Sequence, residues 1–320
     1  MLQNMLTAAE QVAILYILGF IGFIADKTGV FKESTAKKCT DMLFYVVTPA
    51  KILESFFTLE YSDEHLKGLF IAIGCGLLMH TIAALGVLPL FNKTKSDSAV
   101  VYKFASVYGN CGYMGLPLVE AVLGSEGVFY CSAVIISFQI FTFTHGVWAI
   151  NQGKDSKEAK FDIKKIILNP GVLPVFVGLP VFIISKNYPD LVPNIIMQPV
   201  KYIGSMNSPL AMLIFGTYVA NTSFKSIFKN WRIYIVGLYK LILLPLVVAL
   251  GFRLAGLNGV LASTIIITAA TPPANNTIMF CAKYDRDTGL ASQIVSLLSI
   301  VSIITLPVMI ALGDLIVQNI

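Results

Sequence analysis

Two short polar segments interrupt otherwise apolar parts of the chain. GNCGYMGLPL covers residues 109–118, and TPPANN covers residues 271–276. Both contain asparagine together with proline, and the first also contains glycine; glycine and proline interrupt helices. A helix that breaks inside a membrane leaves unpaired N–H groups at the start of the next helix. With the helix dipole, these groups attract a carboxylate. The chemistry that we expect here is reversible binding of a small organic anion.

The candidate binding residues either donate an amide or break a helix. Asparagine side chains add donors without a fixed charge, so a bound anion can be released. Glycines allow two backbones to approach closely, and each proline removes a backbone donor. The sequence does not decide which asparagine contacts the substrate. The predicted substrate-binding residues are Asn110, Gly112, Gly115, Pro117, Pro272, Pro273, Asn275 and Asn276.

Charged residues within the apolar segments form a second group of candidates. A charge at membrane depth costs roughly 2.5–3.5 kcal/mol and is usually functional or paired. Glu120 either carries a coupling proton or pairs with Lys103 or another lysine. Lys51 faces either the substrate path or Glu54, three residues later on the same helix face.

Other polar residues in these segments are weaker candidates. Gln139, Asn207 and Ser208 either line a cavity or bridge to a neighbouring helix. Lys103, Lys201 and Lys240 are further candidates for buried charges. The alternative for Lys201 and Lys240 is a long side chain that reaches the membrane surface.

The elements around these residues indicate a polytopic membrane protein. The 320 residues are 56% hydrophobic and 13% charged, with a mean hydropathy of +0.76, whereas soluble proteins carry roughly 25% charged residues. Apolar segments of ~20 residues, long enough to cross a bilayer, recur along the chain. We expect an all-α protein with ten transmembrane helices at residues 7–25, 39–58, 68–91, 98–123, 127–150, 166–185, 195–221, 230–254, 258–282 and 289–316.

Positive charges predict the orientation of these ten helices. The odd-numbered loops and their flanks contain sixteen basic residues: Lys27, Lys32, Lys37, Lys38, Lys93, Lys95, Lys154, Lys157, Lys160, Lys164, Lys165, Lys225, Lys229, Arg232, Lys283 and Arg286. The opposite side has three: Lys67, Lys186 and Arg253. Because basic residues concentrate on the cytoplasmic side, we expect both termini to be extracellular and the chain to be multi-pass in the cytoplasmic membrane.

The chain also divides into two similar halves. A linker at 151–165 separates residues 1–150 from residues 166–320, and each half contains five predicted spans. We interpret the linker as a solvated cytoplasmic connector, with a regulatory or lipid-binding role as the alternative. Five is odd, so the halves are inverted relative to each other. Matched interrupted spans in inverted repeats indicate a transporter binding site.

The same segments carry a family resemblance. GNCGYMGLPL, the later ATPPANN and CAKYD, and NPG at 169–171 resemble the auxin efflux carrier family. This family covers the plant PIN auxin exporters and bacterial members, some described as malate or other organic-acid permeases. The resemblance extends over essentially the whole chain. The long central loop of many plant members is absent, so regulation housed in that loop is not implied.

The resemblance implies a particular fold and mechanism. Spans 1, 2, 6 and 7 would form a scaffold that can mediate a homodimer, and spans 3–5 and 8–10 would form a transport domain. Spans four and nine would be broken and would cross at Pro117 and either Pro272 or Pro273. The transport domain would move against the scaffold as an elevator.

Secondary active transport of a small organic anion is therefore the leading functional hypothesis. Its partners would be that anion and membrane lipid, without nucleic acid or a cofactor. A cation/proton antiporter on the same crossed-helix fold is the alternative, although antiport normally needs a carboxylate at the break. A receptor with the same pocket is a further alternative. The substrate, the coupling ion and the direction stay open.

The remaining residue patterns argue against other classes of protein. The five cysteines and three histidines are scattered, which predicts neither a metal site nor a disulfide framework. The chain has no GxxxxGK[ST] loop for ATP and no HExxH motif. We therefore expect that it is not an enzyme.

Overall fold

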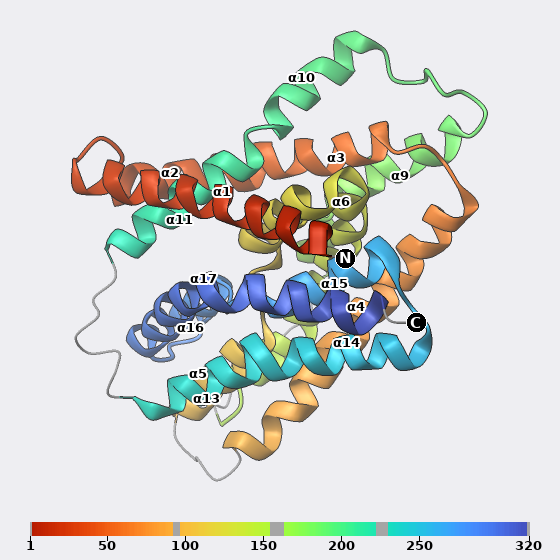
Figure 1. The fold of residues 1–320 in the computed structure, drawn as a ribbon. Coiled ribbons are helices and arrows are strands. Elements are labelled where there is room, and N and C mark those ends of the chain that lie inside the picture. The colour runs from red at the N-terminus through yellow and green to blue at the C-terminus, as the bar shows by residue number, and fades with distance from the viewer. Residues whose placement is uncertain (1, 92–96, 154–162, 222–229, 319–320) are drawn as a thin grey trace. The chain divides into compact units, whose positions relative to one another are not determined.

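The computed structural model describes residues 2–91, 97–153, 163–221 and 230–318 (Figure 1). Within these ranges the regular structure is helical, and strand-like pairing is limited to one isolated bridge between Gly109 and Pro273. The expectation of an all-α protein is confirmed. Most of the predicted linker lies outside the described residues, as do seven of the basic residues used for orientation: Lys93, Lys95, Lys154, Lys157, Lys160, Lys225 and Lys229.

The chain forms two compact units, each assembled from three separated stretches. The first unit comprises Met1–Ile73, Gly112–Ile136 and Ile167–Asn221. The second comprises Gly74–Cys111, Ser137–Ile166 and Thr222–Ile320. Both units therefore draw on both halves of the sequence.

The helices of the first unit come from the first part of each predicted repeat and from residues 112–136 inside the first repeat. The first stretch contains α1 (Leu2–Lys27), α2 (Glu33–Met42), the π-helical turn η1 (Leu43–Val47), α3 (Thr48–Thr58) and the start of α4 (Asp63–Phe91). The other stretches contain most of the π-helical turn η2 (Cys111–Gly115), most of α6 (Leu116–Phe141), α9 (Leu173–Ser185), α10 (Asn194–Gly204) and α11 (Asn207–Ala220).

Close helix packing and an aromatic cluster hold this unit together. α1 lies beside α11 (Figure 1), and a side-chain carbon added at Gly22 would collide with the backbone of Leu213. Small residues at such contacts let membrane helices associate closely. Phe56, Phe129 and Phe182, from α3, α6 and α9, pack with ring centroids 4.7–6.3 Å apart.

The second unit contains the longest of the described α-helices, which lies near the C-terminus. It begins with the rest of α4, α5 (Asp97–Val107), the end of α6, the π-helical turn η3 (Thr142–Gly146), α7 (Val147–Ile150) and α8 (Ile163–Ile167). It continues with α13 (Trp231–Gly237), the π-helical turn η4 (Leu238–Leu243), α14 (Leu244–Ala255), α15 (Gly259–Ala270), α16 (Asn276–Lys283) and α17 (Thr288–Gln318). α14, α15 and α17 pack against one another.

Four helical segments among the described residues are long and apolar enough to cross a membrane. They are Asp63–Phe91, Cys111–Ile150, Trp231–Ala255 and Thr288–Val317. The 40-residue segment is not one straight helix, because Gly124 has φ +66° and ψ −155°. Such a conformation is accessible mainly to glycine. It separates the sequence predicted as span four from that predicted as span five.

Prolines follow three of the four described π-helical turns. Pro49, Pro117 and Pro245 are each the second residue of the α-helix that follows η1, η2 and η4. Proline has no N–H, and its ring clashes with the carbonyl four residues earlier. A wider turn relieves this clash, so the helix continues through the proline.

Two predicted spans are interrupted in the structure. The segment 166–185 was expected as a single helix, but α8 ends at Ile167 and α9 begins at Leu173. The segment 195–221 was expected as a single helix, but α10 ends at Gly204 and α11 begins at Asn207. Gly204 and Ser205 end the first helix, and Asn207, Ser208 and Pro209 suit the first turn of the second.

Candidate functional site

The two polar segments interrupt their helices and pair with each other inside the second unit. α5 ends at Val107 and helix resumes at Cys111, while α15 ends at Ala270 and α16 begins at Asn276. The Asn110 N–H donates to the Pro272 carbonyl at 2.8 Å, and the Ala274 N–H donates to the Tyr108 carbonyl at 2.9 Å. We call residues 108–110 with 271–275 the crossing. Its backbone bonds replace helical bonds that the breaks remove.

The residue opposite Pro273 is Gly109. Pro117 belongs to the first unit and Pro272 and Pro273 to the second, so the expectation that Pro117 forms the crossing pair with one of them stays a prediction. A side-chain carbon on Gly109 would lie 2.7 Å from both Lys240 Nζ and Thr271 Oγ1. Only glycine leaves room for this approach, whereas Pro117 occupies the first turn of α6, where proline is tolerated.

Lys240 is a buried cation beside the crossing. Its residue is 1% exposed, and its ammonium donates to the Ala269 carbonyl at 3.1 Å, in the last turn of α15. Carbonyl groups at the end of a helix carry a partial negative charge. Lys240 therefore neutralises the carbonyl end of a broken helix. Of the two alternatives for Lys240, the structure shows the buried charge and not the side chain that reaches the membrane surface, because η4 directs it into the unit.

The predicted asparagines lie in or next to the crossing with different exposures. Asn110 is 9% exposed, and Asn275 and Asn276 are half-buried. Asn275 is the N-cap residue of α16, but its side chain makes no capping hydrogen bond. In the first turn of α16, the Thr277 hydroxyl is buried and has no hydrogen-bond partner among the described residues. The start of α16 thus presents polar side chains that capping does not use.

Gly112, Gly115 and Pro117 belong to the first unit, immediately after the crossing in the sequence. Gly112 is half-buried, and Gly115 and Pro117 are buried. They form η2 and the first turn of α6, which is the helix start that follows the break.

The predicted intramembrane charges form a cluster in the first unit. Lys51 Nζ lies 3.0 Å from Glu54 Oε2 and also contacts Glu120 Oε1. The Ser208 hydroxyl donates to Glu120 Oε2 at 2.7 Å. Lys51 is thus the lysine partner of Glu120, and it also pairs with Glu54. We call Lys51, Glu54, Glu120 and Ser208 the charge cluster.

Comparison with known proteins identifies the family. The sequence profile of a family described as "Membrane transport protein" matches residues 7–310. The chain belongs to the membrane transport protein family. The family resemblance inferred from the two polar segments is therefore confirmed.

Relatives within this family are named as transporters. An uncharacterized transporter of Methanocaldococcus jannaschii is 23% identical over 89% of this chain and 92% of its own length. An uncharacterized transporter of Methanothermobacter thermautotrophicus is 24% identical over 94% of this chain and 96% of its own. A protein of Rhizobium meliloti named "Putative malonate transporter" is 26% identical over 76% of each chain. The protein is a multi-pass membrane transporter.

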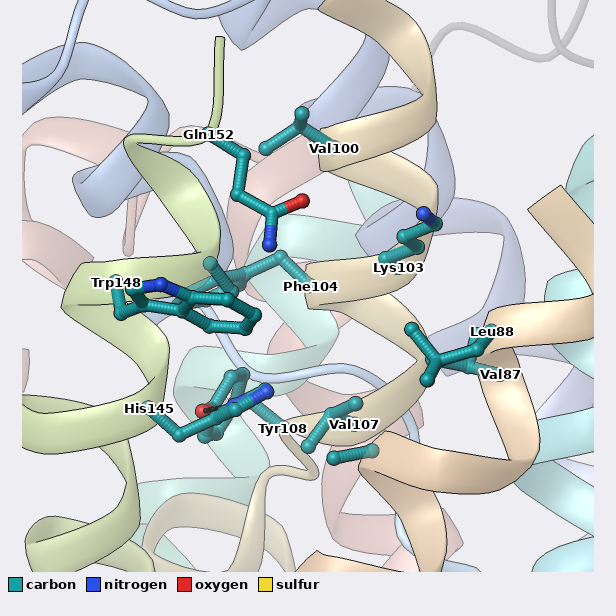
Figure 2. A pocket seen from close by; sticks show the side chains of 12 residues that line it. Val87, Leu88, Val100, Lys103, Phe104, Val107, Tyr108, His145, Trp148 and Gln152 are labelled. Carbon is teal, nitrogen blue, oxygen red and sulfur yellow. Dashed lines mark hydrogen bonds between the residues drawn. The ribbon is translucent and has the colours of Figure 1, made fainter. Parts of the chain in front are cut away.

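In this transporter a pocket adjoins the crossing within the second unit (Figure 2). Lys103, Phe104 and Tyr108 line one side, and His145, Trp148 and Gln152 line the other. Tyr108 OH lies 2.9 Å from His145 Nδ1, and the Tyr108 carbonyl is the one that accepts from Ala274. Lys103 thus belongs to an aromatic pocket.

The remaining predicted polar residues are buried in separate places. Asn207 accepts a hydrogen bond from the Thr48 hydroxyl at 3.3 Å in the first unit, and Gln139 is 5% exposed in the second. Sequence reasoning missed the part played by Tyr108 and left open whether Lys240 is buried. A lysine within a 20-residue apolar run was the available signal for Lys240.

Proposed function

We propose that this transporter is a secondary active carrier of a small organic anion, a carboxylate, in the cytoplasmic membrane. The observation that carries the proposal is the crossing itself: two broken helices pair through their backbones, with Asn110 between them and Lys240 buried alongside. No ATP-binding loop occurs in the sequence, so an ion gradient or the membrane potential would supply the energy.

The charges around the crossing favour an anion as the substrate. Lys240 neutralises the carbonyl end of α15, which leaves the positive N–H end of α16 uncompensated. Asn275 and Thr277 supply polar groups at that end. The proposed binding residues are Asn110, Gly112, Gly115, Pro117, Pro272, Pro273, Asn275 and Asn276. The relative named for malonate makes a short dicarboxylate the first substrate to test.

The proposed topology is ten spans in two inverted repeats of five, with both termini outside. Contacts within each unit support it, because they join loops of the same parity. Asp63 and Lys186 form a salt bridge of 3.5 Å between the second and sixth loops. Lys27 donates to the Ala220 carbonyl at 2.8 Å, between the first loop and the seventh.

A third contact of this kind lies in the second unit. Arg286, in the ninth loop, donates through Nε to the Ile150 carbonyl at 2.9 Å and through Nη2 to the Gln152 carbonyl at 2.6 Å. Ile150 and Gln152 lie at the start of the fifth loop. Loops predicted on the cytoplasmic side are thus joined to one another.

The proposed movement is that of an elevator, with a scaffold of spans 1, 2, 6 and 7 that can form a homodimer. Spans 3–5 and 8–10 would carry the anion. The two compact units divide spans four and five between them, at Gly112 and at Ser137, whereas the proposal assigns both spans whole to the moving domain.

A cation/proton antiporter is the alternative on the same fold. Such a mechanism normally places a carboxylate at the break. In this chain, residues 108–111 and 271–276 contain asparagines but no aspartate or glutamate, and the cation beside them is Lys240. These residue types favour the anion carrier.

Uptake of radiolabelled malonate into proteoliposomes tests the proposal. Asn110→Ala removes a carboxamide from the crossing, and Asn276→Ala removes one from the first residue of α16, next to it. We expect each to weaken malonate affinity about 10- to 100-fold, because a hydrogen bond to a charged group is worth roughly 1.5–3 kcal/mol. Asn187→Ala, in an exposed loop, is the matched control and should behave like the wild type.

Two results would contradict the anion carrier. One is unchanged uptake by both Asn110→Ala and Asn276→Ala. The other is sodium/proton exchange by the wild type with no thermal stabilisation by malonate, succinate or a monocarboxylate, which would favour the antiporter.

A further inference from the structure

The charge cluster of the first unit has an unbalanced charge. Lys51, Glu54 and Glu120 come from α3 and α6, and their side chains are only 8%, 15% and 22% exposed. When all three are ionised, two carboxylates share one ammonium, and the cluster carries a net charge of −1. Among the described residues, the salt bridges of Glu54 and Glu120 involve Lys51 alone.

Neighbouring elements add polar groups around this cluster. From α11, the Ser208 hydroxyl donates to Glu120, and Asn207 bonds to Thr48 of α3 while its own Nδ2 is buried with no partner among the described residues. From α10, Gly204 lies against Glu54, since a side-chain carbon there would be 2.6 Å from Oε2. Lys201, one turn earlier on α10, is the nearest charged residue in that helix.

The centre of the cluster is already occupied by a cation. Lys51 Nζ contacts both carboxylates. A second cation there would be repelled by the ammonium at close range. A proton avoids this repulsion because it binds covalently to a carboxylate oxygen. Neutralising the excess charge also removes the cost of burying it at membrane depth.

We propose that the charge cluster is a proton site, which binds one proton shared by Glu54 and Glu120 and releases it during each transport cycle. Proton binding converts one carboxylate to a carboxyl group and brings the net charge from −1 to 0. As a coupling site it rests on the proposed function, but the protonation itself does not. The crossing and the charge cluster would then have separate tasks, anion binding and proton binding.

Charge counting gives a sharp test. Either Glu54→Gln or Glu120→Gln leaves one carboxylate with Lys51, so the cluster is neutral without a proton. We expect both variants to lose the protonated-carboxyl infrared band that the wild type shows on acidification. Glu126→Gln, also on α6 but paired with His65 near the surface, is the matched control and should keep that band. Lys51→Met leaves two unpaired carboxylates and should strengthen the band.

Transport measurements connect this site to coupling. In proteoliposomes, an imposed pH gradient should drive accumulation of malonate by the wild type and by Glu126→Gln. Glu120→Gln and Glu54→Gln should bind malonate in thermal-shift assays, yet lose the response to the gradient at least ten-fold. If one of these two variants does not fold, the other still gives the result.

The outcomes separate this proposal from the proposed function. A titrating carboxyl band that survives in both glutamine variants would overturn the proton site, and so would accumulation driven by sodium alone. Asn110→Ala should lose malonate binding and keep the band. A wild type that shows the band but binds no carboxylate would support the proton site and contradict the anion carrier.

Discussion

At the residue scale, the main feature of the crossing is the buried charge of Lys240 beside it. Its ammonium is enclosed by protein and held by the Ala269 carbonyl, with Gly109 packed against it. Burying a charge with little solvation is costly, and such a cost is retained where the charge has a function. The geometry supports the role proposed for Lys240 in anion binding, since the charge lies at the carbonyl end of one broken helix.

Replacing this charge should separate stability from function. We expect Lys240→Met to weaken malonate binding at least about ten-fold, because the carbonyl end of α15 would no longer be neutralised. The melting temperature should stay the same or rise, because a buried charge is exchanged for an apolar side chain of similar length. Thermal-shift assays with and without malonate measure both effects.

A second lysine serves as the control. Lys201→Met changes a half-buried lysine on α10 of the first unit and should leave malonate binding unchanged. A Lys240→Met protein with wild-type malonate affinity would refute the role given to this ammonium.

At the element scale, the breaks in the helices have different causes. Proline accompanies a π-helical turn at Pro49, Pro117 and Pro245, and the helix continues through each of them. Helical geometry is lost at 108–110, where Gly109 approaches a second backbone, and at Gly124, where φ is positive. It is also lost at 271–275, which contain no glycine. Proline alone therefore does not mark an interruption of the helix, whereas both segments of the crossing contain an asparagine.

Gly124 provides a test of the turn between the predicted spans four and five. A side chain at φ +66° and ψ −155° is strained although nothing lies within 4 Å of it. We expect Gly124→Ala to lower the free energy of unfolding by about 1–3 kcal/mol, measured by chemical unfolding in detergent. Ser125→Ala, at the exposed neighbouring residue, should change it little. A stabilised Gly124→Ala protein would indicate a continuous helix at this point.

At the scale of the whole molecule, the orientation of the chain remains a prediction supported by contacts. The salt bridge between Asp63 and Lys186 joins two loops predicted outside. A hydrogen bond from Tyr61 lowers the pKa of the Asp63 carboxyl, and the nearby charge of Lys186 lowers it further. Arg286 joins two loops predicted inside.

Cysteine labelling in intact cells tests this orientation. In a chain without its natural cysteines, Asn187→Cys should react with a membrane-impermeant maleimide, because the sixth loop is predicted outside. Lys283→Cys, exposed in the ninth loop, should react only after the cells are permeabilised. Reversed labelling would invert the topology, and labelling of both positions from one side would contradict the number of spans between them.

The sequence by itself determined the class of protein, the family and the location of the two interruptions. The apolar composition indicates that lipid surrounds the chain. Asparagine, glycine and proline indicate where a helix breaks, because their effect on the backbone is local. Neither prediction requires knowledge of tertiary contacts. Only the tertiary structure decided which residues contact one another. That Gly109 faces Pro273, that Lys240 turns inward, and that Glu120 pairs with Lys51 depend on helices brought together from distant parts of the sequence. No local pattern encodes such pairings, because they arise from packing between helices.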